Sequence, residues 1–202
     1  MRISPTREEF RTLASQFGVV PVWAEVLADR HTPVSAFLAL VGDQPGFLLE
    51  SVEHGERWAR FSFVGCRPRA EISLVDGKVR VSGAVPASVP RDKGFLAALE
   101  AMLAAHRAPV MPELPPLQGG MIGHIGYDVV REVEYLPNVP ADDLGWPDAV
   151  LTVTGHVTAF DHFAQRLYLM ENVFLKGNES GQALDALYDA ALEKIGTRVD
   201  SL

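Results

Sequence analysis

The sequence predicts an α+β fold in which antiparallel β-sheets pack against separate helices. Three observations support this class: two hairpin-like segments, several stretches with helical periodicity, and no repeated strand–helix–strand unit. The chain has 202 residues, of which 48% are hydrophobic and 22% are charged, so it can bury a core without disulfides or structural metals. We expect one domain spanning residues 1–202.

Capping residues locate the first two helices. Thr6 is followed three residues later by Glu9, which is a capping-box pattern, and apolar residues then recur at helical spacing as far as Phe17. Thr32 precedes Pro33, and proline is favoured at the first position of a helix. The sequence therefore predicts one helix after Thr6 and another after Thr32.

Proline and glycine define two further features of the N-terminal half. Residues 19–26 are largely β-branched but include Pro21, which cannot donate a backbone hydrogen bond, so this strand is expected at a sheet edge. Asp76 and Gly77 separate two alternating segments, and these residue types favour a type I′ turn, which requires positive φ at both positions. The second pattern predicts a β-hairpin.

Hydrophobic periodicity and the positions of proline and glycine predict the elements of the C-terminal half. In chain order they are a helix at 95–106, a proline-rich linker at 110–116, a glycine-rich strand followed by a helix at 127–134, strands at 149–160 and 166–174 that pair as a hairpin, and a C-terminal helix with an apolar stripe.

Three glycines, Gly120, Gly123 and Gly126, could in principle bind phosphate through backbone N–H groups. The spacing does not match a dinucleotide fingerprint, and no Lys-Ser/Thr pair follows as in a P-loop. We favour the alternative that the missing side chains allow close packing against another backbone. After this segment, Tyr127 is expected to pack and Asp128 to cap the following helix.

Composition disfavours several classes of protein. The formal net charge is −8, from 18 basic and 26 acidic residues, and there is no Lys/Arg run, so nucleic-acid binding is not expected. Cys66 is the only cysteine, which excludes an intramolecular disulfide and suggests a buried packing residue in a reducing, cytoplasmic setting. Neither a secretory signal nor a membrane-spanning segment is expected. The six histidines show no metal-binding spacing.

The strongest candidate site lies where a short apolar strand, 47–49, ends in Glu50 and Ser51. Glu50 can bind an ammonium group, Ser51 can hydrogen-bond to neighbouring polar atoms, and Arg60 on the next strand offers a fork suited to a carboxylate. These groups around an apolar surface would suit a zwitterionic amino acid. The alternative is structural: Glu50 and Arg60 form a cross-strand pair and Ser51 begins a turn.

Two motifs in this order resemble anthranilate synthase component I: LLES followed by GERW at 48–58, and GGMIGHIGYDVVR at 119–131. The segments TPVSAF at 32–37, DDL at 142–144 and PDA at 147–149 are also similar to that family, so the resemblance covers about residues 5–175. His124 stands where the family often has tyrosine.

The resemblance implies a regulatory role. In that family, this N-terminal region of the chorismate-utilising fold binds L-tryptophan as a feedback inhibitor, and the Leu-Glu-Ser motif helps to form the site. Carried over by motif, the effector-binding residues are Glu50 and Ser51, with Arg60 as a looser transfer. The whole enzyme would convert chorismate to anthranilate and pyruvate, with ammonia from a glutamine amidotransferase subunit.

The resemblance also implies a missing part. The family's chorismate-binding catalytic domain, with its Mg²⁺ ligands, follows this region, so we expect the chain alone to lack chorismate chemistry and to be a fragment or an isolated domain. Two alternatives remain: the N-terminal region of aminodeoxychorismate synthase component I from folate synthesis, and a stand-alone, non-catalytic amino-acid-binding module.

Overall fold

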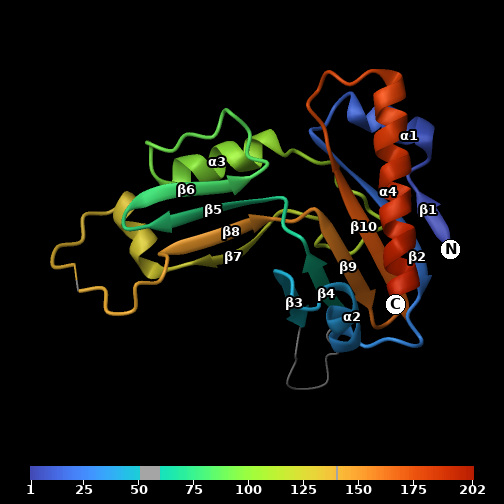
Figure 1. Cartoon of the computed structure of the whole chain (residues 1–202), viewed down its shortest axis with the longest axis horizontal. Helices are drawn as coiled ribbons and strands as arrows, with labels where there is room; N and C mark the ends of the chain where they lie inside the picture. Colours follow the sequence, from blue (N-terminus) through green and yellow to red (C-terminus); the bar gives the residue numbers. More distant parts are fainter. Residues whose placement is uncertain (51–59, 140) are drawn as a thin grey trace. The chain divides into compact units, whose positions relative to one another are not determined.

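The computed structural model describes residues 1–50, 60–139 and 141–202, and within them the strands form two antiparallel sheets accompanied by helices (Figure 1). This arrangement confirms the predicted α+β class. The contacts group the chain into two compact units, one made of 1–68, 106–120 and 154–202, and the other of 69–105 and 121–153. The expectation of one domain over 1–202 stays a prediction, and each unit is described by itself.

The first unit contains a six-stranded sheet in the order β1-β2-β10-β9-β4-β3, and three helices. Its elements are β1 (Arg2–Ser4), α1 (Arg7–Ala14), β2 (Val19–Leu27), α2 (Pro33–Leu40), β3 (Gly46–Glu50), β4 (Phe61–Cys66), β9 (His156–Asp161), β10 (Arg166–Phe174) and α4 (Gly181–Ser201). The capping box predicted at Thr6 is present, since the Thr6 side chain accepts from the backbone N–H of Glu9. Thr32 is the N-cap of α2, as predicted, and its side chain accepts from the backbone N–H of Ser35 in a second capping box.

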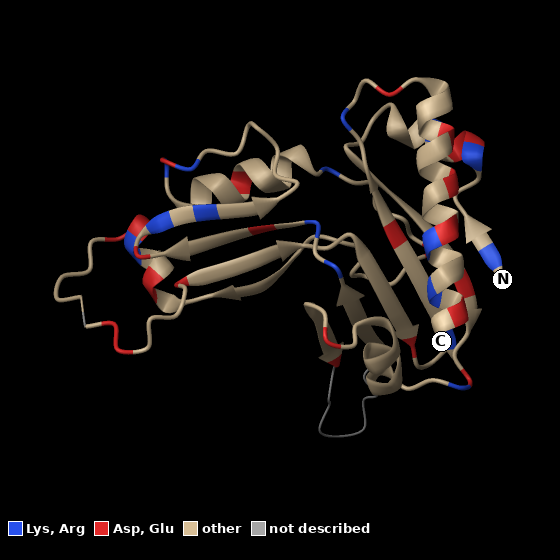
Figure 2. Cartoon of the chain, viewed as in Figure 1, with Lys and Arg blue, Asp and Glu red and all other residues tan. Residues whose placement is uncertain are grey.

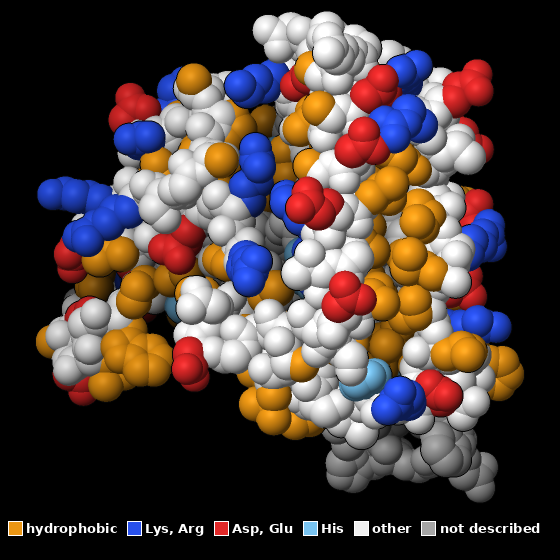
Figure 3. Space-filling view, turned by 45° about the vertical axis from the view of Figure 1, so that its right-hand side comes forward, with side chains coloured by type: hydrophobic (Ala, Val, Ile, Leu, Met, Phe, Trp, Pro, Cys, Tyr) orange, Lys and Arg blue, Asp and Glu red, His pale blue; other side chains and the backbone are white. Residues whose placement is uncertain are grey.

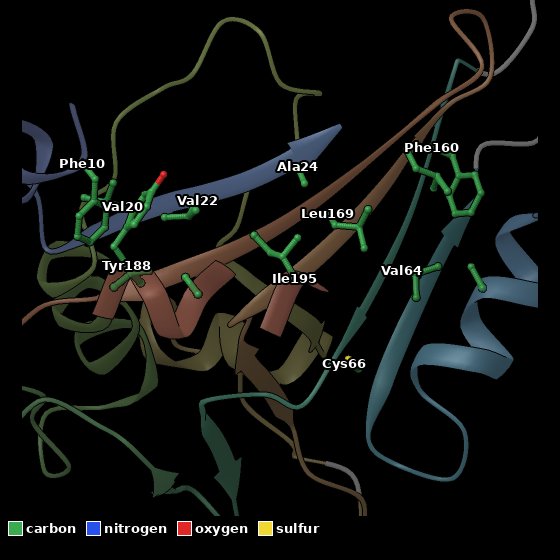
Figure 4. Packing of buried hydrophobic residues seen from close by; sticks show 14 of the residues in the cluster. Phe10, Val20, Val22, Ala24, Val64, Cys66, Phe160, Leu169, Tyr188 and Ile195 are labelled. Carbon is green, nitrogen blue, oxygen red and sulfur yellow. The ribbon is translucent and has the colours of Figure 1, made fainter. Parts of the chain in front are cut away.

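One face of this sheet packs against all three helices. Alternate residues of the strands, such as Val22, Val64 and Leu169, meet Phe10 of α1 and Ile195 of α4 in a single buried cluster (Figure 4). Side chains on a strand alternate between faces, so each strand contributes every second residue to this core. Burial of this apolar face is the main stabilisation of the unit.

The opposite face is covered by a segment that includes Met111 and Leu114. Leu114 of this segment packs with Trp23, Val157 and Met170, which alternate with the residues of the helix-facing core. The linker predicted at 110–116 therefore contributes Leu114 to this core, and Met111 packs against it.

Gln118 holds that segment in place. Its amide oxygen accepts from Met111 N at 3.0 Å and its amide nitrogen donates to Met111 O at 2.8 Å. The buried Asn172 of β10 in turn donates to the Gln118 carbonyl at 3.0 Å.

The expectation that the strand containing Pro21 lies at a sheet edge is wrong for the strand as a whole. β2 lies between β1 and β10, but β1 pairs only with residues 23–25 of it. Pro21 faces Asn172 of β10 on one side and lies beyond the reach of β1 on the other. The proline is tolerated because only one side of β2 carries a strand at that position.

A buried carboxylate connects α4 to the sheet. Glu171 of β10 accepts hydrogen bonds from Lys194 at 2.9 Å and from Arg198 at 2.7 Å, and its side chain is almost fully buried. Figure 2 shows acidic and basic residues mixed along α4. Buried carboxylates require such partners, because an unpaired buried charge is costly.

His156 of β9 pairs with Glu171 of β10 on one side and with Cys66 of β4 on the other. His156 and Cys66 are both buried, as expected for Cys66. Burial raises the pKa of the Cys66 thiol. Burial, together with the positive charges of Arg198 and Arg67, lowers the pKa of His156 well below its ordinary value, so the folded protein holds this imidazole neutral.

This depressed pKa predicts a loss of stability in mild acid. The unfolded chain binds a proton at His156 below about pH 6.5, whereas the folded chain resists protonation, so the free energy of unfolding should fall as pH decreases below that value. His156→Gln should flatten this part of the pH profile in urea titrations at pH 7.5 and 5.0. His31→Gln serves as the control, and equal slopes for wild type and His156→Gln would contradict the prediction.

The second unit contains a four-stranded sheet in the order β6-β5-β8-β7, with α3 packed against β5 and β6. Its elements are β5 (Ala70–Val75), β6 (Lys78–Gly83), α3 (Phe95–Ala105), β7 (Met121–Ile125), the 3₁₀ helix η1 (Tyr127–Glu132) and β8 (Ala149–Val153). The predicted hairpin is confirmed: β5 pairs with β6, and Asp76 and Gly77 have φ of 52° and 67°.

Close backbone approach explains the glycines of β7. A Cβ atom at Gly123 would overlap the Val150 carbonyl oxygen of β8, and one at Gly126 would lie 2.7 Å from the Asp148 carbonyl oxygen. Side chains cannot be accommodated at such separations. The packing role inferred from sequence therefore accounts for Gly123 and Gly126 but not for Gly120, where a Cβ atom would have no neighbour within 4 Å.

The run predicted as one strand over 149–160 is two strands in different sheets. β8 ends at Val153 and β9 begins at His156, so Thr154 and Gly155 carry the chain from one sheet to the other. The hairpin expected between the two C-terminal strands is present, but it joins β9 to β10.

Two expectations for η1 need revision. Tyr127 is 80% exposed, so it does not serve as a packing residue within the described structure. Asp128 accepts from Arg131 Nε at 2.6 Å, and Gly126 at the N-cap provides no side-chain cap. Glu132 of η1 caps a different helix, since its carboxylate accepts from the backbone N–H groups of Phe95 and Leu96 at the start of α3.

Removing this remote cap should destabilise α3. Glu132→Ala leaves two first-turn N–H groups without their carboxylate acceptor, and such caps contribute about 1–2 kcal/mol. Hydrogen exchange should become faster along α3 and remain unchanged in α4. Unaltered exchange in α3 would contradict this assignment, and Glu134→Ala, a nearby exposed acid, is the matched control.

Candidate functional site

The site predicted from sequence lies at one end of the β3–β4 pair. These strands pair antiparallel from Gly46 opposite Cys66 to Glu50 opposite Ser62, and Arg60 directly precedes β4. Glu50 and Arg60 are therefore brought to the same end of the sheet. Ser51, the third predicted residue, lies outside the described residues.

Arg60 is held by Asp161, the last residue of β9. Arg60 Nε donates to the two carboxylate oxygens at 3.2 and 3.1 Å, and Nη2 donates to Oδ2 at 2.7 Å. The Asp161 side chain is only 3% exposed, whereas that of Arg60 is 57% exposed. Arg60 thus pairs with Asp161, not with Glu50 as the structural alternative proposed.

Two aromatic rings flank the Arg60 guanidinium. Its central carbon lies 4.7 Å from the centre of the Phe61 ring and 6.0 Å from that of Phe163. Both distances are in the range of cation–π attraction. The pair with Asp161 and the rings together restrict where this exposed guanidinium can lie.

Asp161 also organises the β9–β10 turn. Its Oδ1 accepts from the backbone N–H groups of Phe163 at 3.1 Å and Ala164 at 3.0 Å. Burial by itself would raise the pKa of this carboxyl, but the hydrogen bonds from Arg60 and the two N–H groups, with the charge of Arg60, outweigh it. The net effect lowers the pKa of Asp161, and the bond with Asp161 raises that of Arg60.

Glu50 and the Arg60 guanidinium lie on different faces of the sheet. Glu50 shares a face with Leu48, which packs against the helix-facing core. Asp161, which holds Arg60, shares a face with Val157 and Ala159 of the opposite core. The structure therefore brings the two predicted residues to one end of the strands without a direct contact between them in the described part of the chain.

Asp161 is the residue that sequence analysis missed. It lies 101 residues from Arg60 in the chain and becomes its neighbour because β9 pairs with β4, Asp161 opposite Phe61. The only local signal was an acidic residue at the end of an apolar strand, which equally indicates a turn.

The described residues offer no other obvious chemical site. They contain no group of three or more His, Cys, Asp or Glu side chains placed to hold a metal ion. No helix among them is long and apolar enough to cross a bilayer. Exposed large apolar side chains, including Tyr135, Leu144 and Trp146, occur in the second unit, and Figure 3 shows hydrophobic side chains beside charged ones on the visible face.

Loss of the Asp161 carboxylate should destabilise the first unit in a pH-dependent manner. Asp161→Ala removes hydrogen bonds from Arg60 and from two backbone N–H groups, for an expected cost of about 2 kcal/mol at pH 7. The folded pKa is depressed, so the stabilisation is present above the unfolded value of about 3.9 and is lost as pH falls through the folded pKa.

Urea titrations of wild type and Asp161→Ala at pH 7 and at pH 3 measure this difference. The difference in the free energy of unfolding between wild type and Asp161→Ala should be smaller at pH 3 than at pH 7. Asp76→Asn removes the charge of an exposed carboxylate that pairs loosely with Arg80 and keeps a residue type suited to the positive φ of this turn, so it should have little effect at either pH. A difference that is constant with pH would contradict an ionic role for Asp161.

Comparison with solved structures identifies the class of fold. The structure is similar to the crystal structure of anthranilate synthase component I from Streptococcus pneumoniae TIGR4, with a TM-score of 0.50 and 26% sequence identity. The match covers 85% of this chain and 36% of that one. The α+β architecture is therefore one found in a component of a biosynthetic synthase.

Sequence comparison specifies the relationship. The chain is 39% identical over 201 residues to anthranilate synthase component 1 of Mycobacterium tuberculosis (strain ATCC 25618 / H37Rv), covering 98% of this chain. It is 37% identical over 198 residues to that of Mycolicibacterium smegmatis. No family model matches the chain. The chain is thus homologous to part of anthranilate synthase component I, as its motifs predicted, and it spans about 38% of the length of these relatives.

Proposed function

We propose that this chain is the N-terminal, tryptophan-sensing region of an anthranilate synthase component I. The observation that carries the proposal is similarity to proteins of that name along 98% of the chain, which includes the Leu-Glu-Ser motif. The end of the β3–β4 pair supplies an acid and a guanidinium, the two charges needed to bind the ends of an amino acid.

In the proposed site, the effector lies across the end of the two strands. Glu50 binds its ammonium group, Ser51 hydrogen-bonds near its polar end, and Arg60 binds its carboxylate. Leu49, which is 42% exposed, and the Phe61 ring offer apolar surface for an indole side chain. This placement requires the amino acid to bridge the two faces of the sheet, because its two partners lie on different faces.

The whole enzyme would aminate chorismate, which would then lose its hydroxyl group and pyruvate to give anthranilate. Ammonia would come from a glutamine amidotransferase subunit, and the chorismate-binding domain, with its Mg²⁺, would occupy the part of the relatives that this chain does not span. Tryptophan inhibits such an enzyme only if it binds one conformation more tightly than another. The effector would therefore favour a conformation that is unable to close around chorismate.

Similarity to proteins named anthranilate synthase component 1 favours anthranilate over aminodeoxychorismate synthesis. A stand-alone binding module would differ in its behaviour, because it would bind tryptophan tightly without further chain. The three proposals are distinguished by ligand affinity in the chain itself and by the product made when the chain is part of a whole enzyme.

Binding of L-tryptophan to the 202-residue chain is the first test. Calorimetry and ¹H–¹⁵N NMR should detect weak binding, with the largest shifts at amides of residues 48–50 and 60–62. Glu50→Gln and Arg60→Met should each weaken binding about tenfold, as expected for loss of a charge-assisted hydrogen bond.

Arg80→Met is the matched control, because Arg80 is also an exposed arginine with an aspartate partner but lies on β6. No shift at these amides at millimolar L-tryptophan would overturn the proposed effector site. Fusion to the catalytic part of a relative should yield anthranilate, and aminodeoxychorismate as the product would favour the folate branch.

A further inference from the structure

The Arg60–Asp161 pair uses only one side of the guanidinium. Asp161 binds Nε and one N–H of Nη2, which together form the inner edge of the Arg60 side chain. The remaining N–H groups, two on Nη1 and one on Nη2, form a second edge suited to two parallel hydrogen bonds with a carboxylate. Nη1 makes no hydrogen bond to any residue within the described ranges.

The two residues differ sharply in their exposure. Asp161 is buried at the end of β9, while more than half of the Arg60 side chain is in solvent. The buried acid anchors the inner edge, and the rings of Phe61 and Phe163 flank the guanidinium. This long, flexible side chain is thereby ordered before a ligand binds. Ligand binding therefore costs less side-chain entropy than it would for a freely moving arginine.

The remaining N–H groups of Arg60 can still bind an anion although Asp161 is negatively charged. The backbone N–H groups of Phe163 and Ala164 also donate to this carboxylate, so its charge is shared among several partners. An incoming carboxylate would approach the adjacent Nη1/Nη2 edge, which Asp161 does not occupy. Asp161 would thus orient Arg60 without touching the ligand, in the way that a supporting residue orients a metal-binding side chain.

We propose that Asp161 is a positioning residue that fixes Arg60 so that its outer Nη1/Nη2 edge binds the carboxylate of an α-amino-acid effector. This inference rests on the proposed function and adds a residue that neither the sequence motifs nor the comparisons identify. It also specifies the ligand class: a free carboxylate is required, and an amine that lacks it gains nothing from Asp161.

The variant Asp161→Asn isolates this role. The asparagine oxygen can still accept from the N–H groups of Phe163 and Ala164, so the turn is kept. The amide nitrogen, however, places a donor against the donors of Arg60 and releases the guanidinium. Far-UV circular dichroism and urea titration establish that the variant folds, and Asp76→Asn, beside Arg80, is the matched control.

The experiment compares two ligands by NMR titration of the 202-residue chain: L-tryptophan, and tryptamine, which has the same indole and ammonium groups but no carboxylate. Asp161→Asn should weaken L-tryptophan binding about fivefold to tenfold and change tryptamine binding less than about twofold. Arg60→Met should show the same selectivity, and the double variant should lose no more than Arg60→Met alone because both changes remove one interaction.

The outcomes separate this inference from the function on which it rests. If Arg60→Met weakens L-tryptophan selectively but Asp161→Asn does not, or if Asp161→Asn weakens both ligands equally, the positioning role is overturned and the effector site stands. If the wild-type chain binds L-tryptophan but Arg60→Met has no selective effect, both the positioning role of Asp161 and the assignment of Arg60 as the carboxylate-binding residue are overturned. Absence of binding to the wild type overturns both.

Discussion

β9 is hydrogen-bonded on both sides, to β10 and to β4, and this antiparallel pairing positions His156 and Asp161 beside their charged neighbours in the first unit. Pairing with β10 places His156 opposite Glu171 at one end of β9. Pairing with β4 places Asp161 opposite Phe61 at the other end, beside Arg60. A change in register by one residue would move each of these side chains to the other face of the sheet.

The two ends of β9 treat charge differently. At the His156 end, the imidazole is buried and kept neutral, while Glu171 is shared by two cations of α4. At the Asp161 end, a buried carboxylate is paired with a cation that remains in water. The first arrangement fastens a helix to the sheet, whereas the second presents a fixed positive group at the surface, where a ligand can reach it.

Features determined by local chemistry were predictable from sequence. The capping box at Thr6, the N-cap at Thr32 and the turn at Asp76 and Gly77 depend on residues within four positions of one another, and all three are present. Features determined by strand order were not. Nothing in the β-branched run around Thr154 distinguishes one long strand from two, and no local pattern connects Arg60 to Asp161. The acid and guanidinium of the site could be identified, but not which face each one occupies.

The clamp formed by Gln118 shows how a proline-containing segment can cover a sheet. Pro112, Pro115 and Pro116 have no N–H to offer, so this stretch could not be secured by pairing as a strand. A side-chain amide carries a donor and an acceptor, and at Gln118 it satisfies both backbone groups of Met111 as a neighbouring peptide would. A glutamate at this position could accept from Met111 N but could not donate to Met111 O. Hydrolysis of this one amide during ageing of the protein would therefore loosen the segment that packs over Trp23 while leaving the strands beneath it paired.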